Sequence, residues 1–249
     1  MNTDLSEKVV WITGGAVGLG RSIVLGFAAE GANISFSYNK SAKEATETEA
    51  RVKASGVRCL AQRVDVLDVG QIRNAAREIE ATFGRIDVLI NNAGVFRRAP
   101  LEEMTEQHFD ETIGVNLKAT LFTSQEAARR MKRQGGGSIL NISSVGGLVP
   151  WGAYPAYCAS KAAALMATRS MALALAPDIR VNCIAPGILT VPEHMGSDDE
   201  SRVKRLKRSI PLGEFGRYDD VVDAALFLTK SGRYITGETL VVDGGRQLK

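Results

Sequence analysis

The sequence has few of the residues that mark metal sites, disulfide scaffolds and histidine chemistry. Its 249 residues include three cysteines and two histidines, and aromatic residues make up 6% of the chain. Cys59, Cys158 and Cys183 are scattered without the paired spacing of metal or disulfide sites, so we expect small buried thiols and no metal centre. His108 and His194 are predicted to be surface or lid residues without a catalytic role.

Long apolar runs and a strong net charge are also missing. The hydrophobic stretches fall well short of the roughly 20 residues that a membrane span requires. Residues 1–15 lead straight into a strand-like segment, without the basic region and apolar core of a secretory signal. A formal net charge of +3 is too small to indicate nucleic acid binding. We therefore expect a cytoplasmic protein that binds neither membranes nor nucleic acid.

The chain instead contains a regular alternation of strand-like and helix-like segments. Apolar runs of strand length occur at 9–13, 33–38, 57–64, 86–90, 138–142, 179–184 and 239–242. Helical spacing of apolar residues occurs between them, including 41–54 behind a Ser41/Glu44 capping box, a segment that begins at Asp68, 105–133, 155–175 and 219–228. This alternation predicts one α/β domain spanning 1–249, a Rossmann-type doubly wound parallel sheet of about seven strands with helices on both faces.

A glycine-rich turn follows the first strand-like run. Residues 13–20 read TGGAVGLG, which places Gly14, Gly18 and Gly20 at a spacing that differs from G-x-G-x-x-G. Glycine lets a backbone turn sharply and approach a pyrophosphate, and the N-terminus of the following helix offers free N–H groups. Between a strand and a helix, this turn predicts dinucleotide binding rather than a plain structural turn.

A tyrosine and a lysine follow the fifth strand-like run. Ser143 to Lys161 reads SSVGGLVPWGAYPAYCASK, with Tyr157 four residues before Lys161. In a helix this step puts both side chains on one face. The ammonium is then predicted to lower the pKa of the phenol from its reference of about 10, which suits proton transfer near neutral pH. Farther upstream, Asn116 lies among apolar residues and is either a satisfied core amide or a functional group.

Together these motifs resemble those of the short-chain dehydrogenase/reductase family over essentially the whole chain. They occur in the family's order: TGGAVGLG at 13–20, Asp65-Val66, NNAG at 91–94, Asn116 within VNL, NISS at 141–144, YCASK at 157–161, APG at 185–187 and TGETLVVDGG at 236–245. The resemblance implies an enzyme that interconverts a carbonyl and an alcohol with a nicotinamide cofactor.

The resemblance also implies a catalytic tetrad of Asn116, Ser144, Tyr157 and Lys161. Tyr157 would protonate the carbonyl oxygen and Ser144 would hold that oxygen by a hydrogen bond. Lys161 would depress the tyrosine pKa and bind the nicotinamide ribose, and Asn116 would hold a water of the proton relay. Ser144 is chosen over Ser143 because the family's serine lies thirteen residues before its tyrosine.

The cofactor contacts implied by the resemblance come from several strand ends. They are Gly14, Gly15, Ala16, Gly18, Leu19, Gly20, Asn39, Lys40, Asp65, Val66, Asn92, Gly94, Tyr157, Lys161, Gly187, Leu189 and Thr190. NAD-specific members carry an acidic residue at the end of the second strand, whereas residues 37–40 here read SYNK. Lys40 favours NADP through its 2′-phosphate, although it can also be a solvated lysine, and NAD stays possible. Val17 departs from the basic residue that many NADP-using members carry.

The substrate pocket is expected to be lined by Phe96, Ser144, Trp151, Tyr154 and Tyr157, under a lid formed by residues 188–216. The chain looks like 3-oxoacyl-carrier reductases, which implies a small carbonyl or alcohol substrate, either free or linked to an acyl carrier or to CoA. The basic residues Arg129, Arg130, Lys132 and Arg133, and Lys204, Arg205, Lys207 and Arg208, either receive an acidic carrier or form solvated helix faces.

Other interpretations of the same motifs stay open. The segments LAPDIRVNCIAPGIL and DGGRQL look similar to pteridine-reductase-like members, although the basic residue usual in their glycine turn is missing here. Another small-carbonyl reductase and an NAD-linked alcohol or sugar dehydrogenase are alternative enzymes, and a scaffold that senses dinucleotides is the non-enzymatic alternative. Family members are typically homotetramers joined through the long helices after the fourth and fifth strands, and we expect the same here.

Overall fold

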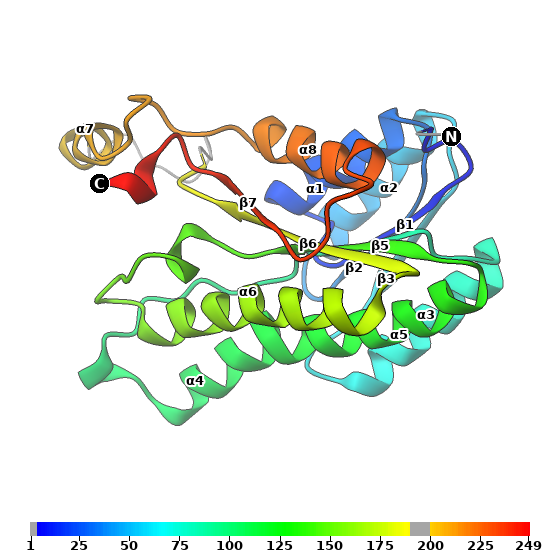
Figure 1. Ribbon diagram of the computed structural model, residues 1–249, viewed down its shortest axis with the longest axis horizontal. Coiled ribbons are helices and arrows are strands. Elements are labelled where there is room, and N and C mark those ends of the chain that lie inside the picture. Colours follow the sequence, from blue (N-terminus) through cyan, green and yellow to red (C-terminus); the bar gives the residue numbers. More distant parts are fainter. Residues whose placement is uncertain (1–3, 190–199) are drawn as a thin grey trace.

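The protein forms a sheet covered by helices on both faces (Figure 1). The computed structural model describes residues 4–189 and 200–249, so the predicted cofactor residue Thr190 and the lid residue His194 lie outside the described residues. Figure 1 shows α1, α2 and α8 on one side of the sheet and α3, α5 and α6 on the other. This arrangement confirms the predicted fold class.

All seven strands are parallel and lie in the order β3-β2-β1-β4-β5-β6-β7. Their bounds are β1 (Val9–Ile12), β2 (Asn33–Tyr38), β3 (Cys59–Arg63), β4 (Val88–Asn91), β5 (Gly137–Ile142), β6 (Ile179–Pro186) and β7 (Thr239–Val242). The chain runs outward from β1 to β3 and then returns to β4 on the other side of β1. The strand order therefore reverses between β1 and β4, and ligands of such sheets bind beyond the carboxyl ends of the strands at that point.

The α-helices are α1 (Gly18–Ala29), α2 (Ala42–Ala54), α3 (Val69–Phe83), α4 (Glu106–Ile113), α5 (Ala119–Arg133), α6 (Pro155–Leu175), α7 (Glu200–Arg208) and α8 (Tyr218–Leu226). Asp68 begins α3 as predicted, because its carboxylate accepts hydrogen bonds from the backbone of Gly70 and Gln71 at 2.8 and 3.3 Å. The predicted capping box at Ser41 is wrong, since that side chain makes no cap bond. Of the described helices, none combines the length and the apolarity needed to cross a bilayer.

Two hydrophobic cores lie on opposite faces of the sheet. In β1, Val10 and Ile12 pack into the core beneath α1, α2 and α8, whereas Val9 and Trp11 pack into the core beneath α3, α5 and α6. Successive side chains of a strand point to opposite faces, so a strand covered on both faces must be apolar throughout. This explains the uninterrupted apolar run at the start of the chain.

The predicted single helix at 105–133 is interrupted. The structure has α4, a π-helical segment at Gly114–Lys118 and then α5. A π segment inserts one residue into the helical repeat. It begins at Gly114, where a Cβ atom would lie 2.5 Å from the Leu67 side chain. The interruption matters because Asn116 lies inside it.

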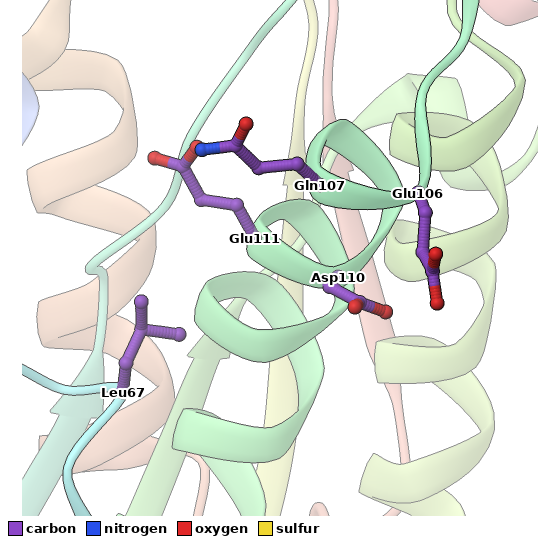
Figure 2. A pocket seen from close by; sticks show the side chains of 5 residues that line it. All are labelled: Leu67, Glu106, Gln107, Asp110 and Glu111. Atoms are coloured by element: carbon purple, nitrogen blue, oxygen red, sulfur yellow. The ribbon is translucent and has the colours of Figure 1, made fainter.

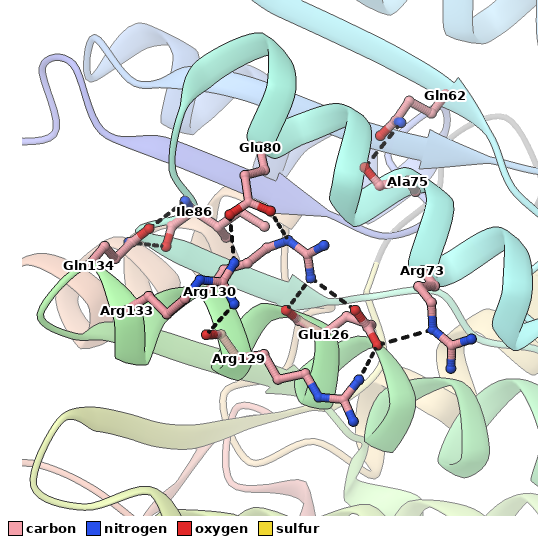
Figure 3. A network of polar contacts seen from close by, with 10 residues as sticks. All are labelled: Gln62, Arg73, Ala75, Glu80, Ile86, Glu126, Arg129, Arg130, Arg133 and Gln134. Atoms are coloured by element: carbon pink, nitrogen blue, oxygen red, sulfur yellow. Dashed lines mark hydrogen bonds and ion pairs between the residues drawn. The ribbon is translucent and has the colours of Figure 1, made fainter.

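Most of the basic cluster at the end of α5 makes ion pairs, within α5 and with α3 (Figure 3). Arg130 is buried and bonds to Glu80 at 3.1 Å and to Glu126 at 2.9 Å. Arg133 also pairs with Glu80 at 2.6 Å, and Arg129 pairs with Glu126 at 2.7 Å. Burial acts to raise the pKa of Glu126, but its arginine partners lower the pKa overall. Arg130 and Arg133 therefore hold α5 against α3, whereas Arg129 pairs within α5 and Lys132 is exposed. The choice between a carrier-docking surface and a solvated helix face stays a prediction.

Candidate active site

The glycine turn after β1 is shaped so that only glycine fits at key positions. Gly14 has φ +68°, a region that residues with a side chain seldom adopt. At Gly20 an added Cβ would lie 2.0 Å from the Gly14 carbonyl oxygen. Val17, which caps α1, makes no side-chain cap bond, so the first N–H groups of the helix have no partner from a capping side chain. The turn thus brings bare backbone and a helix N-terminus to the switch point.

The side chain of Asn92 holds this turn in place. Its amide nitrogen donates to the carbonyls of Thr13 and Gly14, both at 3.0 Å. In return, the Thr13 hydroxyl accepts from the backbone of Asn92 and Ala93 at 3.0 Å. The structure therefore gives this predicted cofactor residue a positioning contact with the turn. Arg21, which the sequence did not single out, supports the same turn by donating to the Ala16 carbonyl at 2.8 Å.

The carboxyl end of β2 is basic and carries no carboxylate. Lys40 is exposed and lines a groove that runs from the glycine turn past Asp65 and Val66. Arg63, the last residue of β3, donates to the Asn39 carbonyl at 3.2 Å and adds a second cation at this end. The sequence analysis missed Arg63, because only the register of β2 with β3 brings it beside Tyr38.

This groove has a volume of about 610 Å³. The predicted cofactor residues that line it are Gly14, Leu19, Gly20, Asn39, Lys40, Asp65, Val66, Asn92 and Gly94. Gly15, Ala16 and Gly18 lie in the turn itself but are not part of this lining. The arrangement gathers most of the predicted set from strand ends that are distant in sequence.

An acidic cleft adjoins the far rim of the groove (Figure 2). It is lined by Leu67, Glu106, Gln107, Asp110 and Glu111. Glu111 also lines the groove, where it pairs with Arg97 at 2.9 Å. Carboxylates repel phosphate, so this cleft disfavours the anionic part of a dinucleotide and the basic end of β2 favours it.

Ser143 and Ser144 at the end of β5 differ in what they contact. The Ser143 hydroxyl donates to the backbone carbonyl of Lys161 at 2.9 Å, which ties β5 to α6. The Ser144 hydroxyl accepts from the Gly146 N–H at 3.0 Å and also interacts with the hydroxyl of Tyr157. The geometry therefore places Ser144, and not Ser143, beside the tyrosine.

Tyr157 and Lys161 lie on one face of α6, but their titration differs from the prediction. Burial raises the pKa of Tyr157, and the smaller opposing effect of Ser144 does not reverse it. The Lys161 ammonium donates to the Ile142 carbonyl at 2.9 Å, and its nitrogen lies 5.8 Å from the centre of the tyrosine ring. The prediction that Lys161 lowers the pKa of Tyr157 is therefore wrong for this structure. Burial also lowers the pKa of Lys161 itself to about 8.

Asn116 is buried in the π-helical segment with its amide fully engaged. Its oxygen accepts from the Val95 N–H at 2.8 Å, and its nitrogen donates to the Val95 carbonyl at 3.1 Å and to the Ser160 hydroxyl at 3.0 Å. Ser160 lies on α6 between Tyr157 and Lys161. The amide thus fixes the loop after β4 against α6, and its role toward a water stays a prediction.

The ring of Tyr157 belongs to a cluster of four aromatic rings, with Phe96, Trp151 and Tyr154. Trp151 stacks on Tyr157 with ring centres 6.0 Å apart and planes 12° from parallel. Phe96 meets Tyr157 edge-on at 4.8 Å and stacks on Tyr154 at 4.6 Å. These are the residues that the sequence predicted for the substrate pocket, and the structure brings them together although Phe96 belongs to a different loop.

A smaller cavity of about 280 Å³ connects this cluster to the glycine turn. Its lining includes the predicted residues Leu19, Asn92, Gly94, Phe96, Ser144, Tyr157, Lys161, Gly187 and Leu189. Tyr218, the first residue of α8, also lines it and was missed by the sequence analysis. Its hydroxyl lies 3.5 Å from where a Cβ of Gly18 would be. The cavity therefore joins the predicted proton donor to the predicted dinucleotide groove.

Comparison with known proteins agrees with this geometry. A family model described as "Enoyl-(Acyl carrier protein) reductase" matches residues 14–247. The chain is 38% identical to the 3-oxoacyl-(acyl-carrier-protein) reductase FabG of Staphylococcus aureus over 240 residues, which cover 96% of this chain and 97% of the relative. The chain belongs to the short-chain dehydrogenase/reductase family. As a member of that family it is an NAD(P)-dependent oxidoreductase acting on CH–OH or C=O groups.

Solved structures of the short-chain dehydrogenase/reductase fold superpose closely on this protein. A putative short-chain alcohol dehydrogenase from Sinorhizobium meliloti gives a TM-score of 0.94 at 33% identity, covering 99% of both chains. A blue fluorescent protein from a metagenomic library, solved in complex with NADPH, gives 0.90 at 34% identity, covering 98% of this chain and 99% of that one. The glycine-only turn and the basic end of β2 in this chain fit a nicotinamide dinucleotide.

Proposed function

We propose that this enzyme reduces a ketone to an alcohol with NADPH, using Tyr157 as the proton donor. The observation that carries the proposal is the cavity in which Ser144, Tyr157 and Lys161 face the glycine turn. A bound nicotinamide dinucleotide supplies the hydride. The residues of the glycine turn, together with Lys40 and Arg63 at the carboxyl end of β2, would hold the dinucleotide by its phosphates.

The proton side of the reaction follows from burial. A phenol whose pKa is raised stays protonated near neutral pH, so Tyr157 is ready to donate its hydroxyl proton to a carbonyl oxygen. The Ser144 hydroxyl would donate a hydrogen bond to the same oxygen. As the proton leaves, the Lys161 ammonium would stabilise the phenolate. Reduction at neutral pH is favoured for this reason over oxidation, which needs the phenolate at the start.

The preference for NADPH rests on the end of β2. Residues 37–40 offer no carboxylate to accept from a ribose 2′-hydroxyl, whereas Lys40 and Arg63 offer cations to a 2′-phosphate. The relatedness to a protein solved with NADPH supports the same choice. Lys40→Ala is expected to raise the Kd for NADPH about tenfold and to leave that for NADH within twofold. Lys43→Ala, an exposed lysine outside the groove, is the control; tighter binding of NADH by the wild type contradicts the proposal.

A 3-oxoacyl thioester is the leading candidate for the substrate, by relationship to the carrier-protein reductase of Staphylococcus aureus. With Arg129, Arg130 and Arg133 engaged in ion pairs, the exposed cations of α7, within the lid segment, are the surface that we propose for an acidic carrier. They are Lys204, Arg205, Lys207 and Arg208.

We further propose that the enzyme is a cytoplasmic homotetramer and that residues 188–216 act as the substrate lid.

The test is consumption of NADPH with a panel of acetoacetyl thioesters, diketones and pterins. Loss of absorbance by the reduced nicotinamide is expected with at least one ketone. A preference for acetoacetyl-carrier protein over its N-acetylcysteamine thioester, lost on Lys204→Glu with Arg205→Glu, would support carrier docking on α7. Failure to oxidise NADPH with every ketone contradicts the reductase proposal.

A further inference from the structure

A cation to which the sequence analysis assigned no role, the arginine of the DGGRQL segment, lies beside the aromatic cluster. The guanidinium carbon of Arg246 is 5.2 Å from the centre of the Trp151 ring. That ring stacks on Tyr157 at 6.0 Å. The distance from the guanidinium carbon of Arg246 to the centre of the Tyr157 ring therefore cannot exceed the sum of these two distances. Arg246 comes from the last residues of the chain, which no sequence motif connects with Trp151.

The turn that carries Arg246 is held firmly. The Asp243 carboxylate accepts hydrogen bonds from the backbone of Gly245 and Gln247 at 2.8 and 2.7 Å. Leu212, which belongs to the predicted lid segment 188–216, donates its N–H to the Gly244 carbonyl at 3.1 Å. In Figure 1 the C-terminal turn lies beside α7 at the end of the molecule where the loop before α6 also lies. The position of Arg246 is thus set by the fold and not by a loose terminus.

The guanidinium of Arg246 makes no ion pair and no side-chain hydrogen bond among the described residues. No described carboxylate lies within ion-pairing distance of Arg246, and no described group accepts a hydrogen bond from its side chain. Burial lowers the pKa of Arg246, with Asp243 acting in the opposite direction, but arginine stays charged at any physiological pH. Burying a cation that has no ion pair costs free energy, so an anion bound beside the Arg246 guanidinium would be stabilised.

The neighbouring cavity also favours an anion. Its described lining contains the Lys161 ammonium and no aspartate or glutamate. The face of Trp151 takes up one side of the Arg246 guanidinium, while the N–H groups at the guanidinium edge stay available for hydrogen bonds. A planar fork of donors matches the two oxygens of a carboxylate or of a phosphate.

We propose that Arg246 is a specificity-determining residue that binds an anionic group of the ketone substrate, a carboxylate or a phosphate, beyond Trp151. This inference rests on the proposed ketone reduction. A carboxylate would come from an oxo acid, whose charge is a few bonds from the carbonyl. A phosphate would come from the phosphopantetheine arm of a carrier- or CoA-linked thioester. The shared chemistry is an oxyanion paired with a guanidinium stacked on an indole.

The experiment compares matched charged and neutral ketones. The carboxylate pair is 4-oxopentanoate with its methyl ester, and the phosphate pair is acetoacetyl-CoA with acetoacetyl-N-acetylcysteamine. For each pair the ratio of kcat/KM, charged over neutral, is measured in the wild type, Arg246→Gln and Arg246→Lys. We expect Arg246→Gln to lower the ratio about tenfold to a hundredfold in one pair, mainly through KM. Arg246→Lys should give an intermediate ratio, because the charge remains without the fork.

Lys249→Gln is the matched control, since it removes a positive charge from the same C-terminal turn. The Lys249 ammonium donates to the Arg208 carbonyl. An equal loss in this control, or a ratio that Arg246→Gln leaves within twofold in both pairs, overturns the proposal. An equal fall in kcat/KM for the charged and the neutral ketone of a pair also overturns the proposal, because that result shows only that Arg246 holds Trp151 in place. The pair whose ratio falls identifies the source of the anion.

Binding without turnover separates this inference from the reductase proposal. The chain has two tryptophans, and Trp11 is buried in the core. Quenching of Trp151 fluorescence by 4-oxopentanoate and by 4′-phosphopantetheine is therefore measured against Trp151→Phe as the blank. Saturable binding of either ligand that weakens at least tenfold in Arg246→Gln supports the proposal even if no ketone is reduced. Equal binding of both ligands by the wild type and Arg246→Gln refutes it, whatever the activity.

Discussion

Replacing Gly20 by alanine tests the architecture of the glycine turn. The new Cβ would lie 2.0 Å from the Gly14 carbonyl oxygen and 2.6 Å from the Asn92 amide nitrogen. Neither contact is relieved by rotating a flexible side chain, because one atom is backbone and the other is held by two hydrogen bonds. Overpacking costs typically about 1–3 kcal/mol, and each neutral hydrogen bond lost costs about 0.5–1.5 kcal/mol. With both Asn92 bonds lost, we therefore expect a loss of about 2–6 kcal/mol.

Thermal unfolding and NADPH binding measure this loss. At about 2–4 °C per kcal/mol for a chain of this size, Gly20→Ala should lower the Tm by about 4–24 °C. It should also raise the Kd for NADPH at least tenfold, because the turn can no longer hold its shape. Gly152→Ala is the control, since no atom lies within 4 Å of its added Cβ. A Gly20→Ala protein with the Tm and the Kd of the wild type would refute the account of the turn.

Three further predictions concern charge and assembly. Because the Lys161 pKa is about 8, its ammonium is lost as the pH rises through 8, so kcat/KM for reduction should fall above that pH; a profile flat to pH 9.5 contradicts this. Arg130→Ala removes the centre of a buried ion-pair network and should cost about 3–5 kcal/mol in urea unfolding, whereas exposed Lys132→Ala should cost less than about 0.5 kcal/mol. Leu121, which is 40% exposed on α5, should lie in a subunit interface; Leu121→Glu is expected to convert tetramers to smaller species by light scattering, and a monomeric wild type contradicts this.

The sequence predicted those parts of the fold that depend on local pattern. The bounds of β2, α6 and β7 agree with the predicted ranges, because an apolar run or a proline at the first helical turn marks their limits. The π-helical segment at 114–118 was not predicted, since a one-residue insertion leaves the apolar spacing of the flanking helices almost unchanged.

The candidate site shows the same division between local pattern and long-range packing. The strand ends predicted which segments meet, and Ser144 lies beside Tyr157 as its spacing implied. The direction of the Tyr157 pKa shift was wrong, because the burial of the phenol depends on Phe96 and Trp151 from other loops. The contact of Arg246 with Trp151 had no local signal, because it joins the end of the chain to a loop far from it in sequence.

The central claim is that Tyr157 donates the proton to the substrate carbonyl, and a single substitution tests it most directly. Single-turnover oxidation of NADPH by a ketone substrate is measured for the wild type, for Tyr157→Phe and for Tyr234→Phe, a fully exposed tyrosine that serves as the matched control. We expect Tyr157→Phe to slow hydride transfer by about 10²–10⁴-fold while its Kd for NADPH stays within a few-fold of the wild type. Hydride transfer by Tyr157→Phe at the rate of the wild type would contradict the account.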